Sequence, residues 1–189
     1  NLNIRLVSSV VIPIPPLDEQ KEIVEILDKA FESIDKAKAN IEKNIENAKE
    51  LFQSKLNQIF SQTAEGWEHI KLKEVCKTGA GGTPLKSKVN YYLNGNIPWI
   101  RSGEVNNRNI IDSEIRITKA GLENSSAKLF PPKTVVIAMY GATAGEVGIL
   151  NFECSSNQAV CGIYPNNTFV PEFLYYKFLD FKENLKSQA

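Results

Sequence analysis

The fold is decided by residues 17–62, LDEQKEIVEILDKAFESIDKAKANIEKNIENAKELFQSKLNQIFSQ. Neither glycine nor proline interrupts this stretch, and its apolar residues recur mainly at alternating steps of four and three. This spacing puts them on one face of an α-helix and is typical of a coiled-coil seam. The seam positions are Ile23, Leu27, Ala30, Ile34, Ala37, Ile41, Ile45, Ala48, Phe52, Leu56 and Ile59.

The predicted helix needs a partner. Forty-odd residues at 1.5 Å each form a rod of roughly 65 Å, which is too long to bury its apolar face on a domain of the size that remains in this chain. We therefore expect a second long helix against the seam, from the same full-length chain or from a homodimer mate. A stutter between Ile41 and Ile45 is expected to relax the supercoil locally. A single solvated helix is the alternative.

On the N-terminal side, residues 1–16 predict a short apolar strand that ends in an extended, proline-rich exit. The apolar residues are Leu6, Val7 and residues 10–12, and prolines follow at positions 13, 15 and 16. Proline cannot donate a hydrogen bond to a sheet, so the strand should end there. Asp18 and Glu19 then suit the positive end of the helix dipole.

On the C-terminal side, residues 63–189 predict an α+β domain of short, twisted strands. Thr63–Gly66 should break the long helix, since Gly66 suits a helix exit. Turn residues are expected at 79–84, 94–95, 106–107 and 165–167, and β-branched runs lie between them. The expected strands are Ile97–Ile100, Glu114–Ile117, Thr134–Met139, Gly145–Leu150 and Val160–Tyr164, and the expected helices are Thr118–Glu123 and Pro171–Leu185.

Composition excludes several classes of protein. The 189 residues carry a formal net charge of zero, and 42% of them are hydrophobic, which suffices for a packed core. No apolar run approaches the ~20 residues of a membrane span. The three cysteines have no CxxC spacing and His69 is the single histidine, so a zinc site is not expected. We interpret the chain as soluble and cytoplasmic, with thiols that are buried by packing.

Known catalytic and nucleotide-binding patterns are missing. The glycines at 79–82 are not followed by a helix as in a dinucleotide-binding fingerprint, and Gly141–Gly145 lacks the lysine of a P-loop. Pro131–Pro132 lacks the flanking residues of a motif that holds a flipped base. His69, the only imidazole, lies at a domain boundary. We therefore expect no catalytic centre and no bound cofactor in this chain.

Binding is the remaining activity, and loop cations indicate nucleic acid as the ligand. Arginine and asparagine can contact base edges in a bidentate manner, while lysines can neutralise phosphates. Residues 67–189 carry fourteen basic and eleven acidic side chains, against seven and ten in residues 18–62. The candidate DNA-binding residues are Lys86, Lys88, Tyr91, Arg101, Asn106, Arg108 and Lys128.

Several motifs resemble the specificity subunits of type I restriction–modification systems. IPIPPLDEQ at 12–20, followed by a long helix, is similar to the segment that closes a target recognition domain in that family. GW at 66–67, KLKEV at 71–75 and GGTP at 81–84 resemble the opening of such a domain, and IPWIR at 97–101, residues 138–148 and SNQA at 156–159 resemble its later landmarks. The similarity covers nearly the whole chain.

The resemblance implies a non-catalytic DNA-binding role. Such subunits carry two recognition domains, each for one half of a split target, separated by two antiparallel helices. Here residues 1–16 would be a closing strand, 17–62 one spacer helix and 63–189 one target recognition domain. Methyltransferase subunits, which bind S-adenosylmethionine, and ATP- and magnesium-dependent endonuclease–translocase subunits would assemble on it.

The length departs from the family, since members are usually about twice as long. An excerpt of a full subunit and a rearranged half-subunit, in which residues 1–16 complete the domain that ends at Ala189, are both geometrically possible. Two other functions remain open: a coiled-coil adaptor with an α+β ligand-binding domain and no DNA role, and the recognition half of a fused restriction–methylation enzyme.

Overall fold

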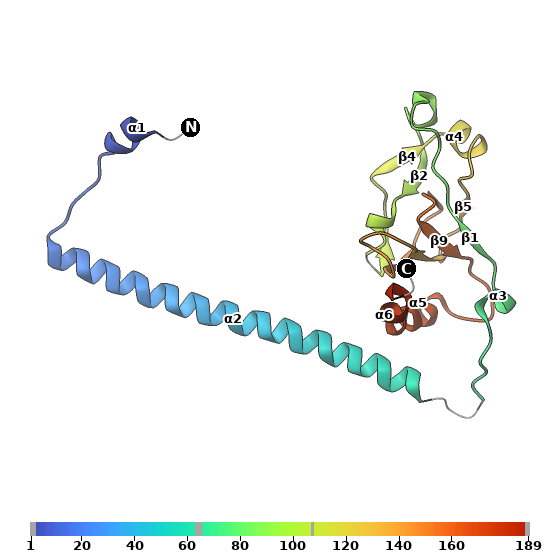
Figure 1. Ribbon diagram of the computed structural model, residues 1–189, viewed down its shortest axis with the longest axis horizontal. Coiled ribbons are helices and arrows are strands. Elements are labelled where there is room, and N and C mark those ends of the chain that lie inside the picture. The colour runs from blue at the N-terminus through green and yellow to red at the C-terminus, as the bar shows by residue number, and fades with distance from the viewer. Residues whose placement is uncertain (1–2, 63–65, 107, 188–189) are drawn as a thin grey trace. The chain divides into compact units, whose positions relative to one another are not determined.

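The computed structural model describes residues 3–62, 66–106 and 108–187. Contacts divide the chain into two compact units, residues 1–52 and 53–189. Of the break expected at Thr63–Gly66, residues 63–65 lie outside the described part, as do Asn107 and the last two residues. The α+β fold expected from the sequence is confirmed, with one long helix and a domain of short strands (Figure 1).

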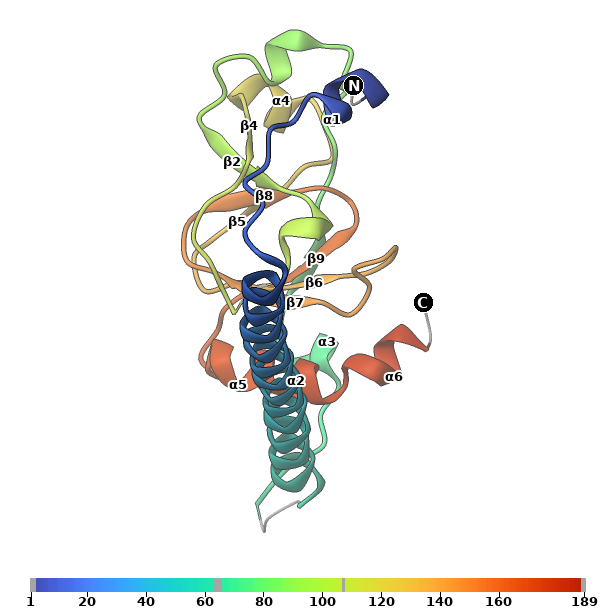
Figure 2. The ribbon, with the colours of Figure 1, turned by 90° about the vertical axis from the view of Figure 1, so that its left-hand side faces the viewer.

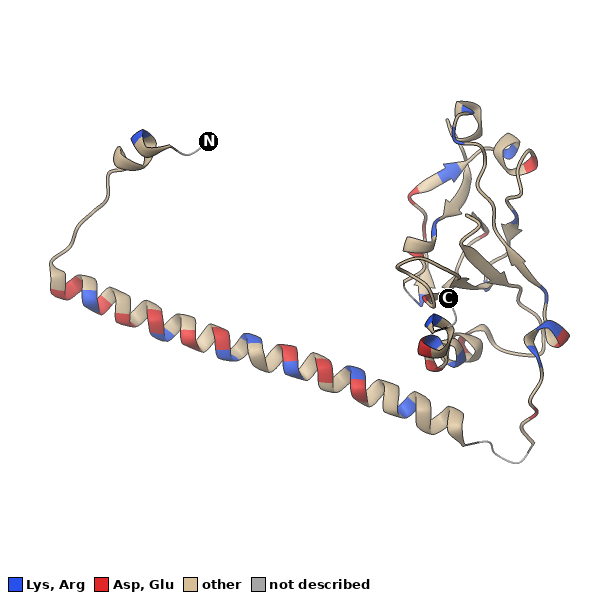
Figure 3. Cartoon of the chain, in the orientation of Figure 1, with Lys and Arg blue, Asp and Glu red and all other residues tan. Residues whose placement is uncertain are grey.

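The long helix α2 runs without interruption from Leu17 to Ser61, 45 residues. The Gln20 amide donates to the Pro15 carbonyl at 2.7 Å and anchors the helix start. Pairs at i,i+4 spacing stabilise its exposed surface: Lys29 with Glu25 and Lys36 with Glu32, each at 2.6 Å. Figure 3 shows the two signs of charge alternating along this helix.

The seam of α2 is exposed over nearly its whole length. Ile34 is 59% exposed and Ile41 60%, whereas Leu56, in the last turns, is only 5% exposed. From Ala37 the seam steps are four, four and three residues, repeated to Ile59. This 11-residue spacing extends the stutter noted at Ile41 and favours a straighter helix pair than heptads do.

The predicted N-terminal strand is wrong, because residues 4–8 form the short helix α1 (Ile4–Ser8). Its first turn is capped by Asn3, whose side chain accepts from the Leu6 amide at 3.0 Å. No described strand pairs with this segment, and an isolated strand leaves its backbone groups unpaired. Val10–Pro16 follows without regular secondary structure.

Two sheets form the domain. The five-stranded sheet has the order β1-β9-β6-β7-β3 and the four-stranded sheet the order β4-β2-β8-β5. The strand bounds are Thr78–Ala80 (β1), Ile97–Ile100 (β2), Asn109–Ile110 (β3), Ile115–Ile117 (β4), Leu129–Phe130 (β5), Val135–Ala138 (β6), Val147–Leu150 (β7), Cys154–Ser156 (β8) and Val160–Ile163 (β9).

The remaining helices are short. They are α3 (Leu72–Val75), η1 (Val89–Tyr91), η2 (Ser102–Glu104), α4 (Lys119–Glu123), α5 (Pro171–Asp180) and α6 (Lys182–Lys186), of which η1 and η2 are 3-10 helices. Thr118 caps α4 by accepting from the Gly121 amide. The helix expected over Pro171–Leu185 is two helices, because the chain turns at Phe181.

Hydrophobic packing creates three layers. Val136 and Ala138 of β6 point between the two sheets, into a core with Phe130 and Cys154, whereas Val135 packs with Leu174 of α5 on the other face. Gly162 of β9 leaves room for the Phe130 ring, since a Cβ there would clash with it. Successive side chains of β6 point to opposite faces of the five-stranded sheet, and this alternation determines which face of that sheet α5 covers.

Both views place α5 and α6 at one end of the domain (Figures 1 and 2). At the other end lie α4 and the green segment that contains η1 and precedes β2. The α2 helix ends against α5, where the Phe60 and Phe173 rings lie 5.6 Å apart. No helix in the described residues is long and apolar enough to cross a membrane.

Candidate nucleic-acid interface

The chain leaves β1 through a tightly packed glycine loop. Gly79 lies in β1 itself, so the turn expected over 79–84 begins later than predicted. The Gly82 amide donates to the Ser156 carbonyl at 2.8 Å, and a Cβ at Gly82 would clash with Ser126. The Thr83 hydroxyl bonds the Gln158 side chain. These contacts fix the starting point of the loop that follows.

Residues 85–95, which we term the helical loop, form a run of tight turns. The backbone amide of Lys88 donates to the Leu85 carbonyl, and that of Tyr91 donates to the Lys88 carbonyl. The amides of Tyr92 and Leu93 both donate to the Val89 carbonyl. The Tyr92 hydroxyl donates to the Pro84 carbonyl, and partial burial raises its pKa. The loop is therefore held rigidly although it lies at the surface.

Tyr91, predicted to contact DNA, is only 6% exposed and packs inside the helical loop. Gly121 of α4 approaches its backbone so closely that a Cβ there would clash. The Lys88 ammonium lies 5.3 Å from the Tyr91 ring centroid and 3.4 Å from its hydroxyl. Tyr91 therefore positions Lys88 and does not itself present a surface to a ligand.

Lys86 and Arg101 line one groove of about 620 Å³ between the helical loop and strand β2. Trp99 closes its inner side: the indole is 3% exposed and its N–H donates to the Gly82 carbonyl at 3.0 Å. Val89 and Leu93 line the outer side. The groove thus combines two cations with aliphatic walls on a fixed aromatic base.

Arg101 is held by carboxylates that lie close in space. Its guanidinium pairs with Glu114 and lies 3.6 Å from Glu104. Glu104 also accepts from the Arg101 amide at 2.8 Å and from the Glu114 amide at 3.0 Å. Because a guanidinium has five N–H donors, this network orients Arg101 while leaving donors for a ligand.

The unpaired positive charge at the groove comes from the lysines of the helical loop, because Arg101 is paired with Glu104 and Glu114. Residues 75–103 carry Lys77, Lys86, Lys88 and Arg101 and neither aspartate nor glutamate. Clustered cations of this kind raise the local concentration of an anionic ligand.

Lys128 forms a second cationic position beside β1. Its side chain passes within 3.7 Å of where a Cβ at Gly79 would lie, next to the Tyr164 ring. The Lys77 ammonium lies 4.8 Å from the centroid of that ring. Partial burial raises the pKa of Tyr164. Lys77 is a candidate that the sequence reasoning missed, since only the pairing of β1 with β9 brings it here.

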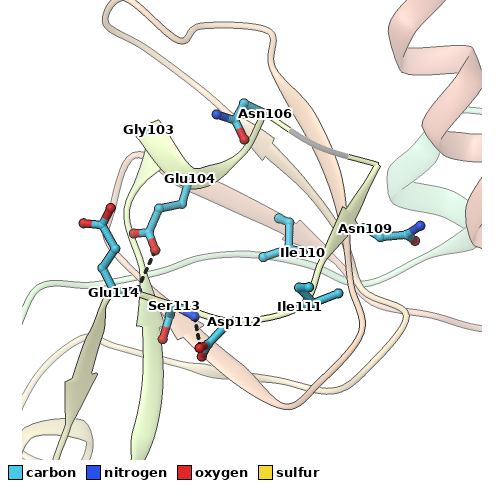
Figure 4. A pocket seen from close by; sticks show the side chains of 9 residues that line it. All are labelled: Gly103, Glu104, Asn106, Asn109, Ile110, Ile111, Asp112, Ser113 and Glu114. Carbon is cyan, nitrogen blue, oxygen red and sulfur yellow. Dashed lines mark hydrogen bonds between the residues drawn. The ribbon is translucent and has the colours of Figure 1, made fainter.

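Asn106 and Arg108 lie away from this groove. Asn106 borders a separate hollow of about 410 Å³ whose walls include Glu104, Asp112 and Glu114 (Figure 4). Three carboxylates make that hollow unfavourable for a phosphate. Arg108 lies over the Tyr176 ring of α5 at 5.3 Å. The predicted residues therefore divide into a set at the groove and its loop and three separated positions, those of Asn106, Arg108 and Lys128.

Among the described residues, no cluster of histidine, cysteine, aspartate or glutamate could hold a metal ion. The domain combines a rigid cationic groove with a long helix whose apolar face is exposed. This combination defines the class: a recognition domain carried on a coiled-coil-forming helix.

Comparison with known proteins identifies the family. The model for the type I restriction modification DNA specificity domain matches residues 1–47 and 64–189. The chain belongs to this family.

Individual relatives agree with this assignment. The EcoR124I/EcoR124II specificity subunit of Escherichia coli is 28% identical over 175 residues, which cover 87% of this chain and 42% of that protein. The MjaIX specificity subunit of Methanocaldococcus jannaschii is 31% identical over 115 residues, 59% of this chain and 26% of that protein. The chain thus spans less than half the length of these relatives.

Solved structures show the same fold. A structure described as the basis of assembly and conformational transition of the type I R-M system matches with a TM-score of 0.77 and 22% identity, over 97% of this chain and 46% of the other. The HsdS subunit of Thermoanaerobacter tengcongensis matches with a TM-score of 0.62 and 21% identity, over 92% and 44%.

Proposed function

We propose that this chain is part of a specificity subunit that binds one half of a bipartite DNA target in a type I restriction–modification complex. The observation that carries this proposal is the cationic groove between the helical loop and β2, in a domain of a DNA specificity family. The chain itself is non-catalytic and holds no cofactor.

The groove suits DNA because it offers two kinds of contact. Lys86 has no acidic neighbour in its segment and suits a phosphate, while Arg101, held by Glu104 and Glu114, has the fixed orientation that a base contact requires. Phosphate contacts position a protein on the duplex, and bidentate arginine contacts to guanine specify the sequence. Lys88, Lys77 and Lys128 add sequence-independent attraction.

The α2 helix has the properties of a spacer and scaffold. Its seam is exposed, and we propose that it packs against a second long helix, from the same full-length chain or from another copy. Methyltransferase subunits would bring S-adenosylmethionine, and the endonuclease–translocase subunit would bring ATP and magnesium. The complex would act in the cytoplasm, where its DNA substrate lies and where the three free thiols remain reduced.

A selection experiment tests the proposal. The full-length chain, assembled with its methyltransferase subunits, would be incubated with a library of randomised duplexes, and bound molecules would be sequenced. We expect enrichment of one sequence, and loss of part of it when Arg101 is replaced by alanine. Absence of any enriched sequence with the intact complex would contradict the proposal and favour a protein-binding adaptor.

A further inference from the structure

Three aliphatic side chains form an exposed row on the helical loop. Leu85, Val89 and Leu93 are 59%, 66% and 63% exposed. Val89 and Leu93 both line the groove, and Leu85 precedes them in the same loop; we term these three side chains the aliphatic row. Large aliphatic side chains that are this exposed do not contribute to the stability of the domain.

The opposite side of the same loop explains why the row is fixed in place. Tyr91 is buried, and Tyr92 donates its hydroxyl hydrogen to the Pro84 carbonyl at 2.5 Å. The Thr118 amide donates to the Tyr91 carbonyl at 2.9 Å, and the Thr118 hydroxyl donates to that of Asn90. These bonds attach the loop to the segment before α4. The aliphatic row is therefore displayed on a rigid support.

Charge identifies the class of partner. The row is accompanied by Lys86 and Lys88, and Arg101, which is paired with Glu104 and Glu114, lines the same groove as Val89 and Leu93. Cations in this number around an apolar surface fit a polyanion that also presents apolar groups. Duplex DNA is such a ligand, because the major groove displays the C5 methyl of thymine between two lines of phosphates.

We propose that Val89 and Leu93 contact thymine methyl groups in the major groove and make the half-site selective for thymine at one or two positions. Lys86 and Lys88 would then bind the flanking phosphates. This proposal rests on the DNA-binding function above and adds the chemical group that the aliphatic row recognises. Burial of one methyl group corresponds to about a four-fold change in affinity.

The test replaces single thymines by deoxyuridine, which lacks only the C5 methyl, in the duplex enriched by selection. Affinity of the assembled full-length chain would be measured for each substituted duplex. We expect about a four-fold loss at one or two positions and no loss elsewhere. The variants Val89→Ala and Leu93→Ala should bind the thymine and uracil duplexes equally at the corresponding position.

Val170→Ala is the matched control, since Val170 is 63% exposed at the opposite end of the domain, before α5. It should keep the full preference for thymine. An enriched duplex that tolerates uracil at every position would overturn the thymine assignment while leaving the DNA-binding function intact, as would a preference unchanged in both loop variants. Failure to enrich any duplex would instead remove both proposals.

Discussion

At the scale of single residues, Arg101 and Lys86 share one groove but differ in their surroundings. Arg101 is oriented by Glu104 and Glu114, whereas Lys86 pairs with no group in the described structure. A side chain held in one orientation can discriminate between bases, while a mobile ammonium supplies attraction to any phosphate. The two cations are therefore expected to contribute to specificity and to affinity, respectively.

The variants Arg101→Ala and Lys86→Ala separate these contributions. Arg101→Ala should weaken binding to the selected duplex by about 1–3 kcal/mol and leave a scrambled duplex nearly unaffected. Lys86→Ala should weaken binding to both duplexes equally. It should also reduce the slope of log K against log salt concentration by about one, because one phosphate contact is lost. Titrations at several salt concentrations measure both effects, with Lys38→Ala on α2 as the control. Equal losses on both duplexes for Arg101→Ala would exclude it from base contact.

Cys154 makes a residue-scale prediction about stability. It lies in the core between the sheets, and burial raises the pKa of its thiol from 9.0 to about 12. The unfolded chain therefore ionises first as pH rises, so the stability that this thiol contributes is complete below pH 9 and is lost between pH 9 and 12.

Denaturant unfolding under reducing conditions at pH 8 and pH 10 tests this dependence. Between these values the wild-type protein should lose about 1.4 kcal/mol more stability than Cys154→Ala, which lacks the titrating group. The comparison between the two pH values cancels the cost of the cavity that the substitution leaves. If both proteins lost the same stability, Cys154 would not titrate as proposed.

At the scale of elements, the sequence predicts those helices and strands whose apolar residues follow a clear pattern. The α2 helix follows from its apolar spacing, and β2, β6 and β9 follow from β-branched runs. Strand β8, Cys154–Ser156, was not predicted, because it is buried on both faces and carries two serines. Strands β3 and β5 are two residues long and exist only through pairing with distant partners.

The candidate site was predicted in part. Lys86, Lys88 and Arg101 come from one acid-free segment, so local sequence suffices to group them. The pairing of Arg101 with Glu114 was not foreseen, since the antiparallel register of β2 and β4 creates it across thirteen positions. Burial of Tyr91 likewise depends on α4, which is remote in sequence.

The seam of α2 supports a prediction at this scale. Ile34 is 59% exposed although it lies on the apolar face, so a partner helix should cover it. Ile34→Asp should weaken self-association or pairing with a second helix by about 100-fold, because a buried unpaired charge costs several kcal/mol. Asn47→Asp adds the same charge away from the seam and should have little effect.

Light scattering of the purified chain, with both variants, measures this association. Wild-type protein that stays monomeric over a wide range of concentration, with a fully helical α2, would contradict pairing of the seam between two copies of this chain.

At the scale of the whole molecule, charge differs between helix and domain. The segment 18–62 carries ten acidic and seven basic side chains, whereas residues 67–189 carry eleven and fourteen (Figure 3). The excess of positive charge lies in the part of the chain that holds the groove, which suits DNA binding by the domain. The matched family segments, 1–47 and 64–189, include both parts.

The central claim is that the domain recognises a DNA sequence and not only DNA charge. The measurement that tests it most directly is the ratio of dissociation constants for the selected duplex and for a scrambled duplex of equal composition, determined at one salt concentration with the assembled full-length chain. We predict tighter binding of the selected duplex by a factor on the order of 10³. A ratio near one at every salt concentration would contradict the account.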